Sequence, residues 1–304
     1  MKVLLGVDGS PDSLYAVKYV GQLLTPQHDE LVFYYVPPAM KVSGSTTSDV
    51  AKRATASLAQ AVFQESFKAL PAGWNDRVSN LVGTQWPGRG LIVAADEVRA
   101  NLIVVGAKGM SLLERFMLGS ISNAVVHHST IPVLVVRKHK DLPPDALTVL
   151  LACDGSEHSQ HAAEFLNQFT WPPGSHGELV AVVESKFLGQ VPAWLAEQAL
   201  TDETEAWAHA WAENHEHEKL SKEHALKDYC QHLSPLFADA KPHLADGQAA
   251  TEILHTAGQL AADLIVVGAR GKQSWQRLLL GGTSDKVLTH AACSVLVVPQ
   301  HEAA

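Results

Sequence analysis

Short apolar runs alternate with longer segments of mixed polarity along the whole chain. Residues 102–106 (LIVVG) and 294–298 (SVLVV) are two such runs, and they are apolar almost throughout rather than at every second position. Continuous apolar strands are expected when helices cover both faces of a sheet. The alternation of such strands with helices therefore predicts an α/β fold with a parallel, doubly wound sheet.

We expect each half of the chain to contain five strands and four helices. In the first half, the expected strands lie near residues 2–8, 31–36, 77–82, 102–106 and 132–136, and the helices near 11–24, 49–69, 88–99 and 119–128. In the second half, the expected strands lie near 148–153, 178–184, 241–245, 264–268 and 294–298, and the helices near 157–169, 193–234, 249–262 and 282–291. Ligands of such sheets bind beyond the carboxyl ends of the strands, where the strand order reverses.

The two halves repeat the same features in the same order. The segments KVLLGVDGSPDS and TVLLACDGSEHS begin at residues 2 and 148, which places Asp154 146 positions after Asp8. The two LIVVG runs correspond at an offset of 162 positions, so the second half carries an insertion before its fourth strand. A match this long indicates duplication. We expect two domains, at residues 1–140 and 147–304, joined by the proline-containing linker 141–147.

Composition narrows the classes of function. A chain of 304 residues has the length of two ordinary domains, and 46% hydrophobic residues allow each domain to bury a core. The net charge of −9 argues against binding of nucleic acid, which favours a basic surface. No apolar run approaches the ~18 residues that a membrane span needs, so we expect no membrane partner.

The three cysteines indicate a reducing compartment. Cys153, Cys230 and Cys293 are widely spaced and form neither a disulfide framework nor a paired metal motif. The first apolar run stops at Asp8, which is too early for a secretory leader and is typical of a strand. We therefore expect a cytoplasmic protein.

A glycine pattern follows the fourth expected strand of each half. In the first half, Gly106, Gly109 and Gly119 are followed by Ser120 and Ser122. A strand that leads through closely spaced glycines into a helix start is the layout that brings backbone N–H groups against a phosphate. The alternative is a pair of glycine turns and a serine helix cap. The second half repeats the spacing with Gly268, Gly271 and Gly281, followed by Thr283 and Ser284.

Asp8 and Asp154 each follow an apolar strand and precede Gly-Ser. A carboxylate in this place suits a phosphate-bound Mg²⁺, which prefers oxygen ligands. The alternative is a local Asx turn or a helix N-cap, since both residues precede an expected helix. Lys108 and Arg270, inside the glycine segments, either contact phosphate or are solvated loop charges.

These residues resemble the universal stress protein family over nearly the whole chain, twice. That family has a Gly-x2-Gly-x9-Gly-Ser/Thr segment after its fourth strand, matched here from Gly106 to Ser120, and a VDGS-like end to its first strand, matched at Asp8. The resemblance implies a five-stranded parallel sheet in each domain, with helices on both faces and the domains packed as a pseudo-dimer through their fifth strands. It also implies bound ATP, ADP or AMP, with or without Mg²⁺. The phosphates are then expected on the glycine segment, and the adenine against the backbone at Val36.

The second half departs from this pattern at two positions. Gly282 stands where the first half has Ser120, so one hydroxyl donor is lost. Glu184 stands where the first half has Val36 when the Leu-Val pairs of the second strands are aligned, and a carboxylate is a poor wall for an adenine pocket. We therefore expect nucleotide mainly in the first half, with weak or no binding in the second.

Residues 192–235 include a long insertion in the second half that is rich in Ala, Glu, His and Trp. Trp207 and Trp211 are four positions apart and share a helical face, which suits a core or a subunit contact. The insertion is also where two chains could pair as a homodimer. Its histidines permit a metal site, because imidazole suits zinc, but a solvated helix face is the alternative. These histidines are His209, His215, His217, His224 and His232.

Three functions fit these observations. The first is a cytosolic stress-response regulator that binds ATP or a related adenine nucleotide. The second is a slow ATP hydrolase, and the third is an interaction module whose glycine segments are purely structural. An efficient enzyme is disfavoured, because the chain contains no GxxxxGK[ST] or GxSxG motif and no histidine in either glycine segment. We therefore assign no catalytic residue.

Overall fold

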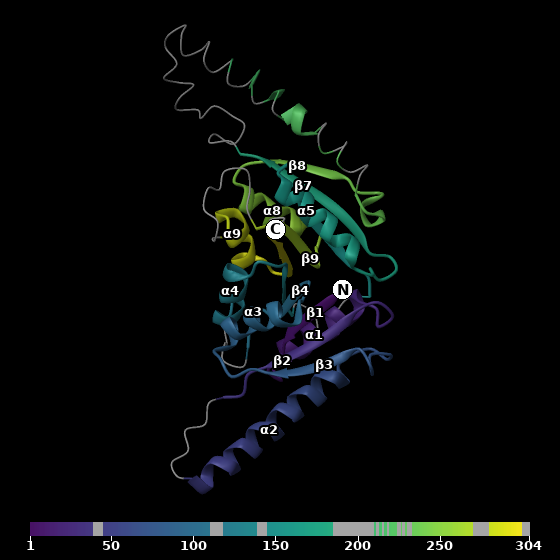
Figure 1. The fold of residues 1–304 in the computed structure, drawn as a ribbon. Helices are drawn as coiled ribbons and strands as arrows, with labels where there is room; N and C mark the ends of the chain where they lie inside the picture. The colour runs from purple at the N-terminus through teal and green to yellow at the C-terminus, as the bar shows by residue number, and fades with distance from the viewer. Residues whose placement is uncertain are drawn as a thin grey trace.

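The computed structural model shows one ten-stranded sheet that runs through both halves of the chain (Figure 1). The strand order is β3-β2-β1-β4-β5-β10-β9-β6-β7-β8. The structure describes residues 1–38, 45–109, 118–138, 145–184, 233–269 and 280–299, together with residues 210, 213, 214, 216, 217, 219–223, 226 and 229.

Each half alternates strands and helices as expected. The first half contains β1 (Lys2–Gly6), α1 (Pro11–Leu23), β2 (Glu30–Tyr35), α2 (Ser45–Lys68), β3 (Val78–Val82), α3 (Pro87–Val98), β4 (Leu102–Gly106), α4 (Ser120–His128) and β5 (Val133–Val136). The second half contains β6 (Thr148–Ala152), α5 (Glu157–Phe165), η1 (Leu166–Gln168), β7 (His176–Val183), η2 (Pro235–Phe237), β8 (Pro242–Asp246), α8 (Ala249–Gln259), β9 (Leu264–Gly268), α9 (Gly282–His290) and β10 (Ser294–Val298).

The expected elements are found with small changes at their ends. The helix expected at 157–169 ends earlier, at Phe165, and continues as the 3₁₀ turn η1. The helix expected at 193–234 lies mostly outside the described residues, although the described positions from 210 to 229 are helical. The α/β fold class is confirmed.

Helices cover both faces of the sheet, which accounts for the continuous apolar strands. Val3 and Leu5 of β1 point into one buried cluster, together with residues of α1, α2 and α5. Leu4 points into the opposite cluster, together with residues of α3, α4, α8 and α9. All three β1 side chains are fully buried, as expected for a strand with a helix layer on each side.

The two halves join edge to edge through their last strands. β5 pairs with β10 in antiparallel register, with Val133 opposite Val297 and Val135 opposite Val295, whereas the other strand pairs are parallel. The expected pairing of the fifth strands is therefore confirmed as a hydrogen-bonded ladder within a single sheet. Each of these two strands removes the exposed edge of the other.

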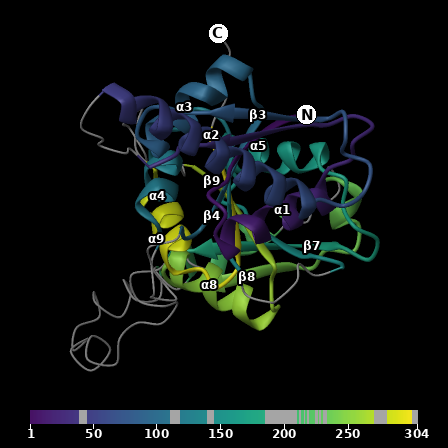
Figure 2. The same ribbon diagram turned by 90° about the horizontal axis from the view of Figure 1, so that it is seen from below.

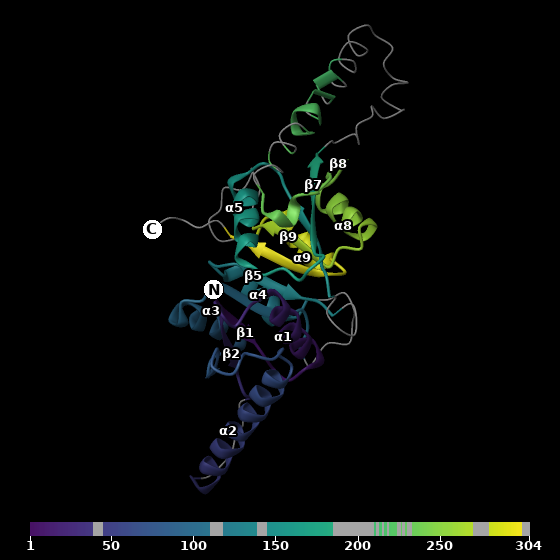
Figure 3. The same cartoon turned by 90° about the vertical axis from the view of Figure 1, so that its right-hand side faces the viewer.

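The molecule is elongated along this sheet. Figures 1 and 3 show α2 at one end and the helical residues between 210 and 229 at the other. Figures 1 and 2 show α4 and α9 as neighbours beside the junction, where His127 Nε2 lies 3.3 Å from Asp285 Oδ1. Within the described part of the chain, no helix is both long and apolar enough to cross a bilayer.

A buried arginine stabilises the junction between the two halves. Arg137 directly follows β5 and is 5% exposed. Its Nη2 donates to the Leu288 carbonyl at 2.6 Å and lies 3.4 Å from the Thr289 carbonyl, both in the last turn of α9. Its backbone N–H donates to Ser294 Oγ at 3.2 Å. A cation at a helix C-terminus satisfies carbonyls that the helix leaves unpaired and complements the helix dipole.

We predict that Arg137→Met lowers the free energy of unfolding by about 2 kcal/mol, because buried carbonyls of α9 lose a charged donor. Urea unfolding followed by tryptophan fluorescence measures the change. Lys68→Met is the control, since it removes an exposed ion pair with Glu65 and is expected to change stability by under ~0.5 kcal/mol. Equal unfolding curves for the two variants would contradict a role for Arg137 at the junction.

Candidate functional site

The strand order of the first half creates a switch point between β1 and β4. The chain runs from β1 outward to β2 and β3, and then crosses back to place β4 on the other side of β1. Loops therefore leave these two strands in opposite directions, which opens a crevice at their carboxyl ends. Asp8 follows β1 and Gly106 ends β4, so the structure brings the two expected site segments together at this crevice.

The glycine segment lies directly against the Asp8 carboxylate. A Cβ atom placed on Gly109 would lie 2.9 Å from Asp8 Oδ2, closer than a real Cβ can approach. The other carboxylate oxygen, Oδ1, accepts a hydrogen bond from the Ser10 N–H at 2.9 Å. Rotation of the carboxylate away from a larger side chain would break this bond. Position 109 therefore admits only glycine without a rearrangement.

Asp8 has both of the features that its sequence context suggested. The Oδ1 bond to Ser10 is an Asx turn, and Gly9 takes a positive φ of +77° within it. Oδ2 faces the glycine segment instead. The helix cap is a different residue, because Ser10 caps α1 by accepting from the Ser13 N–H at 3.2 Å. The local turn thus orients one carboxylate oxygen and leaves the other at the crevice.

The glycine segment ends at the start of α4. The Gly119 N–H donates to the Ala107 carbonyl at 2.8 Å, which closes the segment on itself. Gly119 is the N-cap of α4 and supplies no side chain, so the alternative of a serine cap is wrong. Ser120 is the first helical residue and is exposed. The first turn of α4 therefore presents backbone N–H groups and one free-standing hydroxyl group to an anion.

Ser122 has a structural role that its sequence position did not reveal. It is 4% exposed, and its Oγ donates to the Gly106 carbonyl at 2.7 Å. Ser284 makes the same bond to Gly268, also at 2.7 Å. The proton of each hydroxyl is directed at the end of the preceding strand. The sequence predicts both serines as donors to a phosphate. In the structure their hydroxyl groups instead tie the start of each helix to the end of the preceding strand.

Val36 lies just beyond β2 and contacts Gly83, a residue that the sequence analysis missed. A Cβ on Gly83 would lie 2.8 Å from Val36 Cγ2, and the Gly83 N–H donates to the Tyr35 carbonyl at 2.8 Å. Gly247 follows β8 in the same way and donates to the Val183 carbonyl at 3.1 Å. A glycine directly after the third strand of both halves was the available signal.

Asp12 is a second missed residue. Its backbone carbonyl carbon and oxygen would lie 3.2 and 3.3 Å from a Cβ on Gly106, so it lies against the end of β4. Burial raises the pKa of the Asp12 carboxyl, Lys108 and Lys138 lower it, and Asp8 raises it. The counterpart in the second half is His158, whose Cβ would lie 2.9 Å from a Cβ on Gly268. The duplicated segments already differ at this position.

The second half repeats the described hydrogen bonds of the site but loses one hydroxyl. The Gly281 N–H donates to the Ala269 carbonyl at 2.8 Å, and Gly281 caps α9 as Gly119 caps α4. Gly282 replaces Ser120 as the first helical residue, and Thr283 is half-buried. The Asp154 Oδ1 accepts from the Ser156 N–H at 2.9 Å, repeating the Asx turn. Gly271 and Arg270 lie outside the described residues.

The register of β7 changes the comparison at Glu184. Lys2 pairs with Glu30 in the first half, but Thr148 pairs with His176 in the second. The β2 and β7 sequences align through a shared Glu-Leu-Val, yet β7 is shifted by two residues along its neighbour. Along β6, Val182, which is half-buried, is therefore level with Val36. Along β8 the Gly247 bond to Val183 repeats the Gly83 bond to Tyr35, which keeps the exposed Glu184 as the residue that follows, so its place beside the second site stays a prediction.

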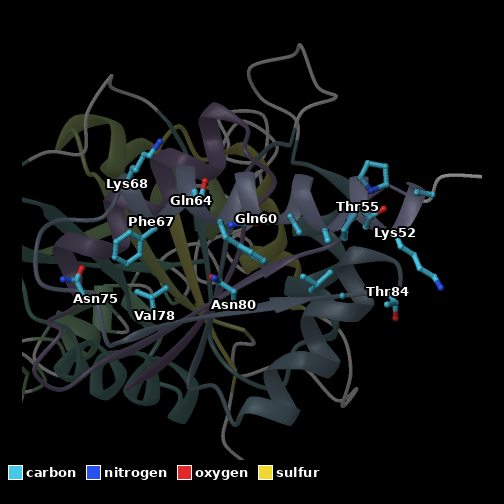
Figure 4. Close-up of a pocket in the computed structure, with 18 residues that line it drawn as sticks. Lys52, Thr55, Gln60, Gln64, Phe67, Lys68, Asn75, Val78, Asn80 and Thr84 are labelled. Carbon is cyan, nitrogen blue, oxygen red and sulfur yellow. The ribbon is translucent and has the colours of Figure 1, made fainter. Parts of the chain in front are cut away.

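An open groove of about 1150 Å³ lies between α2 and β3 (Figure 4). Figure 4 shows Thr84 and Lys52 at one end of the groove, and Asn75, Phe67 and Lys68 at the other. The groove does not reach Asp8 or the glycine segment. Gly83 and Pro37 line it, so it approaches the crevice only where β2 and β3 end.

The insertion gives no support to a metal site in the described part of the chain. Among its five histidines the structure describes only His217, which is exposed. No group of three potential ligand residues is found among the described residues. Trp207 and Trp211 lie outside the described residues, together with His209, His215, His224 and His232.

The comparisons with known proteins agree with the duplication. The sequence model of the Universal stress protein family matches residues 1–137 and again residues 147–299. A universal stress protein of Mycolicibacterium smegmatis is 30% identical over 202 residues, which make up 66% of this chain and 62% of that protein. The match therefore spans less than two thirds of that relative.

Solved structures share the fold. A universal stress protein from Archaeoglobus fulgidus matches with a TM-score of 0.63 at 20% identity, covering 99% of this chain and 98% of that chain. A universal stress protein solved in complex with cAMP is 25% identical, with a TM-score of 0.34, over 45% of this chain and 96% of its own.

We predict that Ser122→Ala and Ser284→Ala each lower the free energy of unfolding by about 1 kcal/mol, because each leaves a strand-end carbonyl without its donor. Thermal and urea unfolding measure both effects. Ser120→Ala is the control and is expected to change stability by under ~0.5 kcal/mol, since Ser120 is exposed. Unaltered stability in both buried-serine variants would contradict the structural role.

We predict that Asp12→Asn raises the free energy of unfolding by an amount that depends on pH. The folded pKa of Asp12 is raised above its usual value of 3.8, so the ionised side chain costs stability that is absent at low pH. The variant is therefore expected to be more stable than the parent at about pH 7, with the difference vanishing as pH falls below the usual value. Unfolding midpoints across this range measure it, with the exposed Asp76→Asn as the control for net charge. A gain that grows toward low pH would contradict the assignment.

Proposed function

The chain belongs to the universal stress protein family, and from this premise we propose that its first half binds an adenine nucleotide, ATP or the related ADP or AMP, as a cytoplasmic stress-response regulator. The observation that carries this proposal is the contact between Gly109 and Asp8 at the switch point. Gly109 leaves room for the strand-end carboxylate, so that Asp8 Oδ2 lies at the glycine segment where a phosphate is expected.

The phosphate end of the proposed ligand lies at the start of α4. Backbone N–H groups of the first helical turn and the exposed Ser120 hydroxyl are donors to phosphate oxygens. Gly109 and Gly119 let the chain approach the phosphates closely. Hydrogen bonds to a charged group contribute about 1.5–3 kcal/mol each.

The carboxylates of this site fit a nucleotide-bound magnesium ion. Asp8 Oδ2 faces the glycine segment, and Asp12 lies against the end of β4. Carboxylate oxygens are the ligands that Mg²⁺ accepts, and Mg²⁺ is usually held by one or two of them together with phosphate oxygens. Asp8 is the residue that would contact the ion. When bound, the ion would neutralise charge between the carboxylates and the phosphates.

The base end of the proposed ligand lies at Val36 and Gly83. Val36 is half-buried and packs against the cluster beneath α3 and α4. None of the described residues donates a hydrogen bond to the Val36 carbonyl, so it is an acceptor for the exocyclic amine of adenine. A Cβ on Gly83 would lie 1.9 Å from the Tyr34 hydroxyl and 2.8 Å from Val36 Cγ2, so a larger residue there would crowd this wall. An apolar wall with one backbone acceptor suits a flat base with an amino group.

The second half is proposed to bind nucleotide more weakly. It lacks the Ser120 hydroxyl, because Gly282 starts α9, and it has His158 in place of Asp12. The two halves therefore share backbone donors but differ in side chains. Cys153 and Cys293 are buried free thiols, which is in keeping with the proposed reducing compartment.

We predict that the intact protein binds one equivalent of Mg-ATP tightly, and that Gly109→Val reduces this affinity at least tenfold. The valine would displace Asp8 and break the turn that orients it. Isothermal titration with Mg-ATP measures stoichiometry and affinity, with ADP, AMP and cAMP as competitors. The matched variant Asp154→Ala alters the second half and is expected to leave the tight site unchanged. Two equal sites, or unaltered binding by Gly109→Val, would contradict the proposal.

A further inference from the structure

A lysine from the inserted segment is bonded to the strand end of the second half. Lys222 Nζ donates to the Val182 carbonyl at 3.1 Å, at the carboxyl end of β7. One turn earlier, Lys219 Nζ lies 3.4 Å from Asp246 Oδ2, at the carboxyl end of β8. Both residues are helical. The two cations thus lie across the ends of two adjacent strands.

The same helical face is anchored farther along. Leu226 is 4% exposed and belongs to the buried cluster that contains residues of α5. Tyr229 Oη donates to the Ser159 carbonyl of α5 at 3.0 Å. Spacings of three and four residues separate Lys219, Lys222, Leu226 and Tyr229, which places all four on one side of a helix. The position of Lys222 is therefore set by packing as well as by its own hydrogen bond.

In the register with the first strand of each half, β1 and β6, the Val182 carbonyl is level with the Val36 carbonyl. The Val7 N–H donates to the Tyr34 carbonyl at 2.9 Å, and the Cys153 N–H donates to the Val180 carbonyl at 2.8 Å. Two residues beyond these acceptors, the chain reaches Val36 in one half and Val182 in the other. The first carbonyl has no donor among the described residues, whereas the second has the Lys222 ammonium.

The segments that connect the second and third strands also differ between the two halves. In the first half, α2 stands between β2 and β3 in the chain and leaves the groove of Figure 4 open beside Gly83 and Thr84. In the second half, the inserted segment stands between β7 and β8 and brings Lys219 and Lys222 to the corresponding strand ends.

We propose that Lys222 closes the base end of the second site, so that the second half excludes an adenine ring although its sequence retains the three glycines. An incoming amine would compete for the Val182 carbonyl with an ammonium that is held there by helix packing. Displacement would cost the ammonium this hydrogen bond, which disfavours entry of the base. Lys222 is thus a specificity-determining residue that makes the halves unequal. The proposal rests on the nucleotide function proposed above.

When the tight site is removed by mutation, the affinity of the second half for Mg-ATP can be measured by itself. In a Gly109→Val background, Mg-ATP titration reports mainly on the second half. Addition of Lys222→Met keeps the apolar stem and removes the donor, and it is expected to raise the affinity for Mg-ATP about tenfold or more. Lys241→Met is the matched control. It also removes one lysine charge from this domain, but at the opposite end of β8, and it is expected to leave the affinity unchanged.

Two further variants test whether a donor at position 222 and the cation at position 219 keep the second site closed. Lys222→Arg preserves a donor and is expected to keep the site closed, whereas Lys219→Met removes a partly exposed lysine and is expected to open the site by a smaller factor. Thermal unfolding confirms that each variant is folded. If neither Lys222→Met nor Lys219→Met raises the affinity, the inference is overturned. If the intact protein still binds Mg-ATP at one tight site, such a result refutes only the role of Lys222. If the intact protein binds no Mg-ATP, the proposed nucleotide function is itself refuted.

Discussion

The antiparallel pairing of β5 with β10 is the constraint on which the rest of the molecule depends. Each half is a parallel sheet whose last strand would otherwise expose a row of unpaired backbone groups. Joining the two edges produces one ten-stranded sheet and places both candidate sites at carboxyl ends of central strands. It also brings the end of α9 against Arg137, so that a single buried cation satisfies carbonyls of the opposite half. The two halves therefore contribute their strands to one continuous sheet.

Within this frame, the described hydrogen bonds at the two ends of the glycine segment are preserved, and the side chains around them diverge. The bonds of Ser122 and Ser284 to the preceding strand have equal lengths, and Gly119 and Gly281 close their segments with the same bond to an alanine carbonyl. Duplication has thus retained what holds the segment in shape. Ser120, by contrast, becomes Gly282. The two copies thus share these structural bonds and differ in the side chains around them.

The candidate site could be located from the sequence because its parts follow strands. Asp8 and Gly106 each end an apolar run, and parallel strands bring such ends to one edge. The contact between Gly109 and Asp8 was not predictable, because it depends on the side-chain orientation set by the turn at Ser10. Ser122 was misread for a similar reason. A hydroxyl near a predicted anion site can face the anion or the strand behind it, and only packing distinguishes the two.

By itself, the sequence determined the duplication, the order of strands and helices, and the glycine segments, because periodicity and spacing are local properties of the chain. The tertiary structure decided the register of β7 along β6. Shifting a parallel strand by two residues keeps every side chain on its own face of the sheet, so hydrophobic pattern cannot detect the shift. It sets Val182, rather than Glu184, level with Val36 along the neighbouring first strands. The bond between Lys222 and Val182 also belongs to the tertiary structure, because 40 residues of chain separate the partners and only the fold of the inserted segment brings them together.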